Sequence, residues 1–326
     1  SLSFIAGPDY EDPSDTGGDN LYEVEITVSD GTNTTSQALI ISVGDLNDRG
    51  PVISNLATSV SIEENQISVV TVSASDPDND TLTYTLSGTD ASSFSISSSG
   101  VITFNSAPDY ETKTSYTVTV NVSDGTNTTT QTLTVNITNV NDISPVISSS
   151  ATFSVAENQT AVDTVSASDA EGDSLTYSLS GTDAASFSIS SSGVITFGSA
   201  PDYETKTSYS ITVNVSDGVN TTTQDITISI TNVNDNTPVI TSSATFSAAE
   251  NQTDVGTVSA SDADGDSLTY SLTGTDASSF SISSSGVITF NSAPDYETKT
   301  SYSVTVTVSD GTNTDTQALT VNVTNV

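Results

Sequence analysis

The sequence predicts an all-β protein of tandem Greek-key sandwiches, of immunoglobulin type, arranged end to end. Two observations support this prediction. The tripeptide Asp-Tyr-Glu begins at residues 109, 202 and 295, and each copy follows the last by 93 residues, which is the length of one domain. Between the copies, apolar and polar residues alternate in short runs that end at glycine-containing turns.

The repeats divide where a proline closes a linker that contains Asn-Asp, at Pro51, Pro145 and Pro238. We therefore expect complete repeats over residues 49–142, 143–235 and 236–326. Residues 1–48 match only the C-terminal half of a repeat and are called the half-repeat. Because half a sandwich cannot bury a core alone, we expect the chain to be a window cut from a longer array. Completion by a neighbouring molecule is the alternative.

Each strand is predicted by alternation of apolar and polar residues. In the run from Tyr116 to Val122, for example, apolar residues alternate with Thr and Asn, so one face is apolar and the other polar. Turn dipeptides of Ser-Gly or Asp-Gly separate the runs, and no stretch has helical periodicity. About seven short strands in one repeat are typical of a Greek-key sandwich. In the first complete repeat we expect strands over residues 70–74, 82–86, 94–96, 101–104, 116–122 and 133–137.

The charge of the chain limits its partners. The sequence has 41 acidic residues against four basic ones, which gives a net charge of -37. Such a surface repels nucleic acid and anionic membranes, so we expect neither as a partner. No apolar run is long enough for a membrane helix, so no membrane insertion is expected within this window. The same charge attracts cations, although it could simply keep the chain in solution.

The missing residue types restrict the chemistry further. Cys, Met, Trp and His are all absent, so there are no disulfides, thiolate ligands or imidazole bases. Carboxylates, Asn amides and backbone carbonyls remain as ligands, and this oxygen set suits Ca²⁺. That metal, together with a composition rich in Ser and Thr, favours an extracellular or cell-surface location, as in secreted bacterial arrays.

Four acidic motifs return at the same place in every complete repeat: an early Glu-Asn, Ala-Ser-Asp-x-Asp/Glu, Asp-Tyr-Glu, and Val-Ser-Asp-Gly. The linkers read Asp-Leu-Asn-Asp-Arg-Gly-Pro, Asn-Val-Asn-Asp-Ile-Ser-Pro and Asn-Val-Asn-Asp-Asn-Thr-Pro. In order and spacing, these motifs resemble those of the cadherin repeat over the whole chain. The resemblance implies about three Ca²⁺ per junction, held by the upstream repeat, the linker and the downstream repeat.

The resemblance also implies the ligands of each junction. The first would use Asp9, Glu11, Asp45, Asn47, Asp48, Asp76, Asp78 and Asp124. The second would use Glu64, Asp109, Glu111, Asn139, Asn141, Asp142, Asp169, Glu171 and Asp217. The third would use Glu157, Asp202, Glu204, Asn232, Asn234, Asp235, Asp262, Asp264 and Asp310. Half a site awaiting a further repeat would comprise Glu250, Asp295, Glu297 and Asn325.

The sequence departs from the family pattern in several places. Asn139 and Asn232 replace the first linker Asp, which removes one charge per site and should weaken binding. Glu171 replaces an Asp and needs more room. Arg49 and Ile143 replace the second linker Asn, where only a backbone carbonyl is expected to bind. The chain has no Trp, so adhesion by exchange of a Trp-bearing strand cannot be carried over. Three further acids are expected at the surface or behind the ligands: Asp80, Asp173 and Asp266.

Two more specific readings of the acidic residues fail. On a strand, Asp109 and Glu111 would point the same way at a spacing of roughly 7 Å, which could suit an inverting glycosidase. The pair recurs four times among other carboxylates, however, so we expect no enzyme. The run from Asp262 to Asp266 resembles the start of an EF-hand loop, but Thr273 stands where that loop needs its bidentate Glu.

These observations favour a calcium-stiffened extracellular stalk of a large bacterial surface adhesin. Its expected partners are Ca²⁺ and further repeats of the same chain at both ends, with like chains or a cell-surface ligand as additional possibilities. The alternative is a segment or subunit of an extracellular filament or matrix. Carbohydrate binding on the sandwich surface has less support, because there is no Trp and most Tyr residues fit the core pattern.

Overall fold

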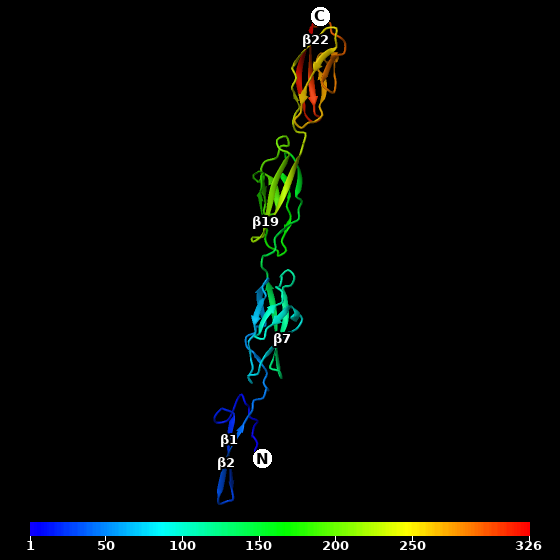
Figure 1. The fold of residues 1–326 in the computed structure, drawn as a ribbon. Helices are drawn as coiled ribbons and strands as arrows, with labels where there is room; N and C mark the ends of the chain where they lie inside the picture. Colours follow the sequence, from blue (N-terminus) through cyan, green and yellow to red (C-terminus); the bar gives the residue numbers. More distant parts are fainter. The chain divides into compact units, whose positions relative to one another are not determined.

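The computed structural model describes all residues 1–326, and it confirms the all-β prediction (Figure 1). Helix is limited to three single 3-10 turns: η1 (Ala91–Ser93), η2 (Ala184–Ser186) and η3 (Ala277–Ser279). The chain divides into two compact units, Ser1–Asp142 and Ile143–Val326. The first unit holds the half-repeat and the first complete repeat, and the second unit holds the other two complete repeats. No helix is long and apolar enough to cross a bilayer.

The first complete repeat is a sandwich of a four-stranded and a three-stranded sheet. The larger sheet has the order β4-β11-β10-β7 and the smaller one the order β5-β9-β8, while β3 and β6 form a separate short pair. The strands are β3 (Val52–Ile53), β4 (Ser59–Glu63), β5 (Ser68–Thr71), β6 (Ala74–Ser75), β7 (Thr83–Ser87), β8 (Phe94–Ile96), β9 (Val101–Phe104), β10 (Ser115–Ser123) and β11 (Thr128–Thr138).

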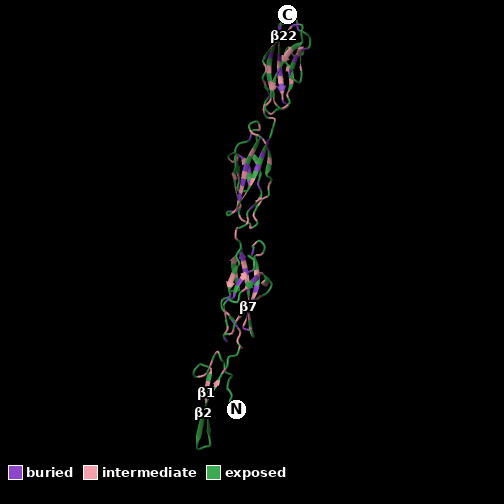
Figure 2. Ribbon diagram, in the orientation of Figure 1, coloured by how far each residue is buried: buried purple, intermediate pink, exposed green.

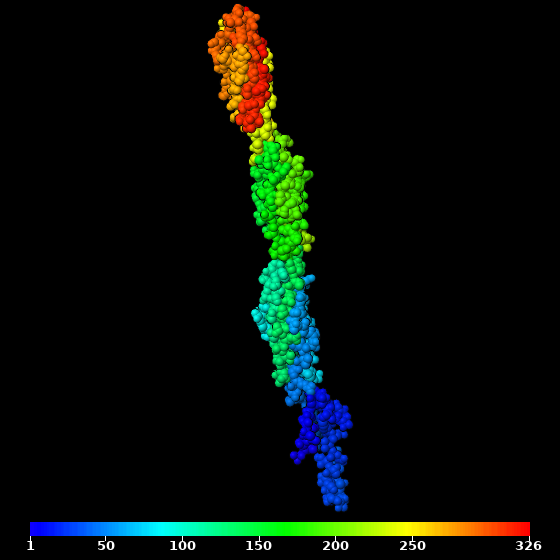
Figure 3. Space-filling view, turned by 180° about the vertical axis from the view of Figure 1, so that it is seen from behind, coloured from blue at the N-terminus to red at the C-terminus, as the bar shows by residue number.

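The other two complete repeats have the same order of strands in their sheets. The second is built from β12 (Val146–Ile147), β13 (Thr152–Ala156), β14 (Ala161–Thr164), β15 (Ala167–Ser168), β16 (Thr176–Ser180), β17 (Phe187–Ile189), β18 (Val194–Phe197), β19 (Ser208–Ser216) and β20 (Thr221–Thr231). The third is built from β21 (Val239–Ile240), β22 (Thr245–Ala249), β23 (Asp254–Thr257), β24 (Ala260–Ser261), β25 (Thr269–Thr273), β26 (Phe280–Ile282), β27 (Val287–Phe290), β28 (Ser301–Ser309) and β29 (Thr314–Thr324). In the space-filling view of Figure 3, the orange and red parts of this last repeat pack against each other without a gap.

The core of each repeat lies between its two sheets, where the alternating residues of the long strands point inward. Val118, Val120 and Val122 of β10 are fully buried. Figure 2 shows buried segments, in purple, along the strands of the complete repeats. Phe94 and Phe104 pack with their ring centroids 4.3 Å apart. One close turn requires glycine: Gly100 has φ +79°, and a Cβ there would lie 2.2 Å from the Val72 carbonyl oxygen.

A parallel pairing in each repeat positions the acidic residues. Strand β4 runs parallel to the last strand, β11, with Ile62 opposite Ile137 and Glu63 opposite Thr138. The early Glu64 therefore follows β4 at the same end of the sheet where the chain leaves β11 for the linker, and its N–H donates to the Thr138 carbonyl at 3.1 Å. The fold thus brings the start of each repeat to the linker that ends it.

The half-repeat contains one hairpin, of β1 (Leu21–Ser29) and β2 (Thr34–Ser42). The two strands pair in register from Leu21 opposite Ser42 to Ser29 opposite Thr34. No residue of the half-repeat is buried, and its hairpin is drawn almost wholly as exposed in Figure 2. The predicted alternation forms the strands here, but it buries nothing.

Candidate metal centres

The third junction lies within the second unit and gathers its acids from four segments of the chain. One carboxylate oxygen from each of Glu157, Glu204, Asp235 and Asp264 lies within 4.8 Å of the others. Glu157 follows β13, Glu204 lies in the Asp-Tyr-Glu turn, Asp235 lies in the linker and Asp264 follows β24. Four carboxylates so close repel each other unless a cation lies among them.

The early Glu157 is held rigidly although it is almost completely buried, at 2% exposed. Its Oε2 accepts the Tyr203 N–H at 2.8 Å, and its Oε1 accepts the Val233 N–H at 2.7 Å. These bonds tie the Asp-Tyr-Glu turn and the linker to one side chain. A buried charge with this geometry is oriented before any ligand binds.

The linker is fixed on the downstream repeat by Asp264. Its Oδ2 accepts the N–H groups of Asp235 and Asn236 at 3.0 and 2.8 Å, and its Oδ1 accepts the Asn236 side-chain amide at 2.8 Å. The hydrogen bond from that amide lowers the pKa of Asp264. Burial, together with repulsion by Glu157 and Asp264, raises the pKa of Glu204. The opposite directions are those expected where one acid is well hydrogen-bonded and its neighbour is crowded.

The downstream part of the third junction has carboxylate oxygens without a protein partner. Asp310 is 8% exposed, and its Oδ1 accepts two backbone N–H groups at 2.6 Å, while its Oδ2 is buried without a hydrogen bond. The Oδ2 of Asp262 is also buried and unpaired. Asn234 donates its side-chain amide to the Asp310 carbonyl at 3.4 Å. Buried anionic oxygens without donors are costly, so a cation fits this donor set.

The first junction, within the first unit, has a similar cluster. One oxygen from each of Glu11, Asp45 and Asp78 lies within 4.8 Å of the others. Asp78 is 5% exposed, and its Oδ2 accepts the N–H groups of Asp48 and Arg49 at 3.0 and 2.9 Å, while its Oδ1 is buried and unpaired. Burial raises the pKa of Glu11 to about 7, with repulsion from Asp78 adding to it.

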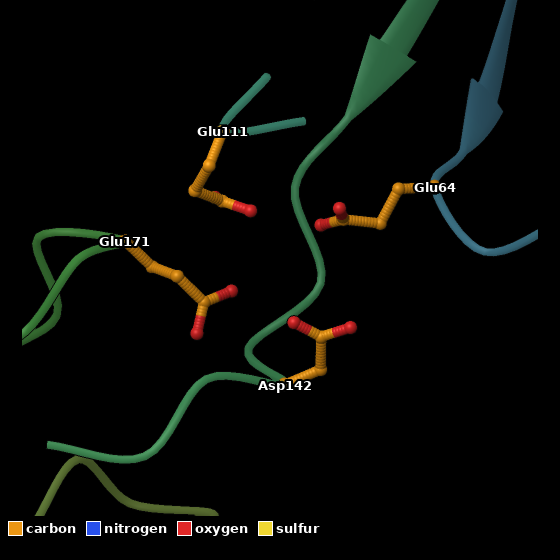
Figure 4. Close-up of side chains that lie close together, drawn as sticks. All are labelled: Glu64, Glu111, Asp142 and Glu171. Carbon is orange, nitrogen blue, oxygen red and sulfur yellow. The ribbon is translucent and has the colours of Figure 1, made fainter. Parts of the chain in front are cut away.

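The predicted ligands of the second junction are divided between the two units. In the first unit, Glu64, Glu111 and Asp142 bring their oxygens together, as Figure 4 shows. Glu64 is 2% exposed and accepts the N–H groups of Tyr110 and Val140 at 2.7 and 2.8 Å.

In the second unit, one oxygen from each of Asp169, Glu171 and Asp173 lies within 4.8 Å of the others. The Oε2 of Glu171 accepts the Ile143 N–H at 2.9 Å, so the glutamate that replaces an aspartate here still reaches the linker.

In the complete repeats, the Asp of the Asp-Tyr-Glu motif has a further role that the sequence did not indicate. The Oδ2 of Asp109 accepts the Thr112 hydroxyl at 2.8 Å, and Asp202 does the same with Thr205 at 2.9 Å. The hydrogen bond from Thr112 lowers the pKa of Asp109. These carboxylates close their own turn, while the Glu two residues later joins the cluster.

At the C-terminal end the predicted half site has the same arrangement. Glu250 is 7% exposed and accepts the N–H groups of Tyr296 and Val326 at 3.2 and 2.9 Å. The Asn325 side-chain amide donates to Oε1 of Glu297 at 3.1 Å.

In the acidic loops at residues 76–80 and 169–173, the third acid lies beside the two acids before it. Asp80 and Asp173 were expected at the surface or behind the ligands. Both are only partly exposed, and each lies in a cluster with the two acids before it: Asp76 and Asp78, or Asp169 and Glu171. The loop turns back on itself, because Asp76 Oδ1 accepts the N–H groups of Asp78 and Asp80 at 2.9 and 3.3 Å.

Comparisons with known proteins agree with this architecture. The sequence profile of the cadherin domain matches residues 58–138 and 243–324. The chain belongs to the cadherin family. A profile described as a bacterial Ig domain matches residues 141–231, so the middle of the chain is also similar to that group.

The cadherin relatives are much longer than this chain. It is 30% identical to human Protocadherin Fat 1 over an alignment of 311 residues. That alignment covers 85% of this chain and 7% of the relative. It is also 30% identical over 259 residues to the Drosophila melanogaster Protocadherin-like wing polarity protein stan, covering 71% of the chain and 7% of the relative. The chain therefore spans less than a tenth of either relative.

Solved cadherin structures have the same fold. Mouse Cadherin-23 EC22-24 superposes with a TM-score of 0.74 at 26% identity, covering 86% of this chain and all of that one. The Protocadherin GammaB4 extracellular domain superposes with a TM-score of 0.76 at 25% identity, covering 96% of this chain and 56% of that one. The resemblance to the cadherin repeat is thus confirmed, and the acidic clusters are compatible with the calcium binding typical of cadherin domains.

Proposed function

We propose that this chain is a segment of an extracellular adhesion stalk whose junctions are stiffened by Ca²⁺. Its units would be the half-repeat and the complete repeats at residues 49–142, 143–235 and 236–326. Each junction would hold up to about three Ca²⁺ through the ligands implied by the sequence, and the partly buried carboxylates of Asp80 and Asp173 would be additional ligands. Further repeats would continue the stalk at both ends.

The observation that carries this proposal is the third junction. Glu157, Glu204, Asp235 and Asp264 converge there, and the chain's three lysines are paired elsewhere. The donors are all oxygen, the ligand type of Ca²⁺. A bound ion would balance the charge of the cluster and would join side chains of one repeat, the linker and the next repeat.

The protein supplies the positions of the oxygens. Backbone hydrogen bonds orient Glu157 toward the linker, and the Asp264 carboxylate holds the linker by accepting its backbone N–H groups. With these groups fixed, binding would require little rearrangement of the repeats themselves. Chelation should leave each sandwich folded while the joint between two sandwiches loosens.

Calcium titration by calorimetry tests binding at the level of single ligands. We expect Asp235→Ala to weaken binding at the third junction by roughly tenfold or more, because it removes a bridging charge. Asp80→Ala should weaken binding at the first junction. Asp163→Ala is the matched control, because Asp163 is an exposed acid on β14, outside the predicted ligand set, and it should bind like the wild type.

Small-angle scattering tests the stiffening. The average end-to-end distance of the wild-type chain should fall when Ca²⁺ is removed by a chelator. The proposal would be wrong if the chain bound no Ca²⁺ in a buffer of matched ionic strength. It would also be wrong if the scattering were the same with and without Ca²⁺.

A further inference from the structure

Arg49 is the one cationic side chain in any linker of this chain. The other three basic residues, the lysines, each form an ion pair inside a complete repeat, with Asp90, Asp183 and Asp276. At the position of Arg49, the second and third linkers carry Ile143 and Asn236. The first junction therefore differs from the others in charge as well as in sequence.

The guanidinium of Arg49 lies against both carboxylates of the upstream Asp-Tyr-Glu motif. Its Nη2 is 2.5 Å from Oδ2 of Asp9, and its Nε is 3.5 Å from Oε2 of Glu11. Its side chain is 39% exposed, whereas that of Glu11 is only 12% exposed. The ion pair thus reaches from the linker across to the half-repeat, at the place where the predicted metal ligands of that side lie.

The third junction shows what stands there without the arginine. The Asn236 amide donates to Oδ1 of Asp264 at 2.8 Å, to Oδ1 of Asp235 at 3.0 Å and to Oε2 of Glu204 at 3.3 Å. This amide orients the same kinds of carboxylate but adds no charge. The acids of the third junction therefore keep their full attraction for a divalent ion, whereas those of the first do not.

We propose that Arg49 is a resident cation of the first junction and takes the place of one Ca²⁺ there. A guanidinium stays protonated at any physiological pH and cannot be lost to a chelator. It offsets the charge of Asp9 and Glu11, and it repels a second cation from the same pair. The first junction would then bind fewer Ca²⁺ than the third and would stay tied without them. This inference rests on the proposed calcium-binding function.

Native mass spectrometry of the whole chain at saturating Ca²⁺ tests the ion count through a reciprocal exchange. Arg49→Asn copies the third linker, and we expect it to bind one more Ca²⁺ than the wild type. Asn236→Arg copies the first linker and should bind one fewer. Asn236→Ile, which copies the second linker, removes the amide without adding a charge and should keep the wild-type count. Unchanged counts in both exchange variants would overturn the inference.

Distances between spin labels test the tie itself, and the absence of cysteine allows labels to be placed at will. One pair at the exposed Thr35 and Thr85 spans the first joint, and one at the exposed Ser178 and Ser271 spans the third. In chelator, we expect the distance distribution to broaden at the third joint and to stay narrow at the first. Arg49→Asn should broaden the first joint as well.

The outcomes separate the two proposals. If neither joint responds to Ca²⁺, the calcium-stiffened stalk fails. If the third joint responds and the first broadens equally in wild type and Arg49→Asn, only the role of Arg49 fails. Arg49→Lys keeps the charge but loses the planar guanidinium, so it should keep the low ion count with a looser joint.

Discussion

The hairpin of the half-repeat and the corresponding hairpin of the first complete repeat have nearly the same design but opposite surroundings. Strands β1 and β10 are both nine residues long, and each pairs in register with the strand that follows it. Yet Val28 is 62% exposed, whereas its counterpart Val122 is fully buried. Leu39 is 39% exposed and its counterpart Leu133 is again fully buried.

The difference shows what alternation of residues can and cannot do. It decides which face of a strand is apolar, because successive side chains point to opposite faces. It does not bury that face. In the complete repeat the sheet β5-β9-β8 covers it, and the described half-repeat has no such sheet. The same apolar residues therefore should stabilise one hairpin strongly and the other very little.

The largest expected effect comes from truncating the paired leucines. Leu133→Ala should destabilise the first complete repeat by about 2–5 kcal/mol, because it leaves a cavity in a closed core. Leu39→Ala should change the stability of the half-repeat by no more than about 0.5 kcal/mol, because the side chain is already exposed to water.

Hydrogen exchange of the amides in β10 and β11 measures the first effect, because it reports the opening of that repeat separately. The amides of β1 and β2 report the second. If the two leucine variants lost the same stability in their hairpins, something outside the described chain would have to cover the half-repeat.

A smaller effect is expected at Glu64, a feature that the half-repeat lacks. Glu64→Gln keeps the shape of the side chain but turns one acceptor into a donor facing the N–H of Tyr110 or Val140. At saturating Ca²⁺ this should cost about 1–3 kcal/mol in the opening free energy of the first complete repeat. Its exposed neighbour provides the control, and Glu63→Gln should exchange like the wild type. If Glu64→Gln were as stable as Glu63→Gln, the hydrogen bonds of Glu64 would not contribute to the stability of the repeat.

The smallest expected effect concerns the protonation of Glu11 in the half-repeat. Burial raises the pKa of Glu11 from 4.5 to about 7. Because the folded-state pKa lies above the unfolded one, the calcium-free fold holds a proton there between these pH values, and its stability falls as pH rises toward 7. The Ca²⁺ that remains at the first junction, held by Glu11 together with Asp45 and Asp78, needs the Glu11 carboxylate, so its binding near pH 6.5 should release that proton.

Calorimetry in buffers with different ionisation enthalpies counts the released protons. The release at the first junction should shrink at pH 8.5 and should be absent in Glu11→Gln. If Glu11→Gln released as many protons as the wild type on binding Ca²⁺, the acid with the raised pKa would be a residue other than Glu11.

The sequence was enough to predict the turns and most strands of each sandwich. It did not predict β3 or β4, and the strand expected over residues 70–74 is divided between β5 and β6. The alternation of Val118, Val120 and Val122 is a local property, and it predicted correctly which face they share. The early Glu64 and Glu157 could be matched to cadherin motifs but not to partners. Their hydrogen bonds come from residues 46 and 76 positions later, which only the parallel pairing with the last strand brings near.

What the sequence determined by itself was the repeat, the two faces of each strand, and a donor set of oxygens without Cys or His. These follow from chain geometry and side-chain chemistry at each position. The tertiary structure decided which oxygens converge, that Asp80 and Asp173 join them, and that Arg49 meets Asp9 and Glu11. The physical reason is that a charge interacts through space, so its partners depend on how loops far apart in the chain are brought together.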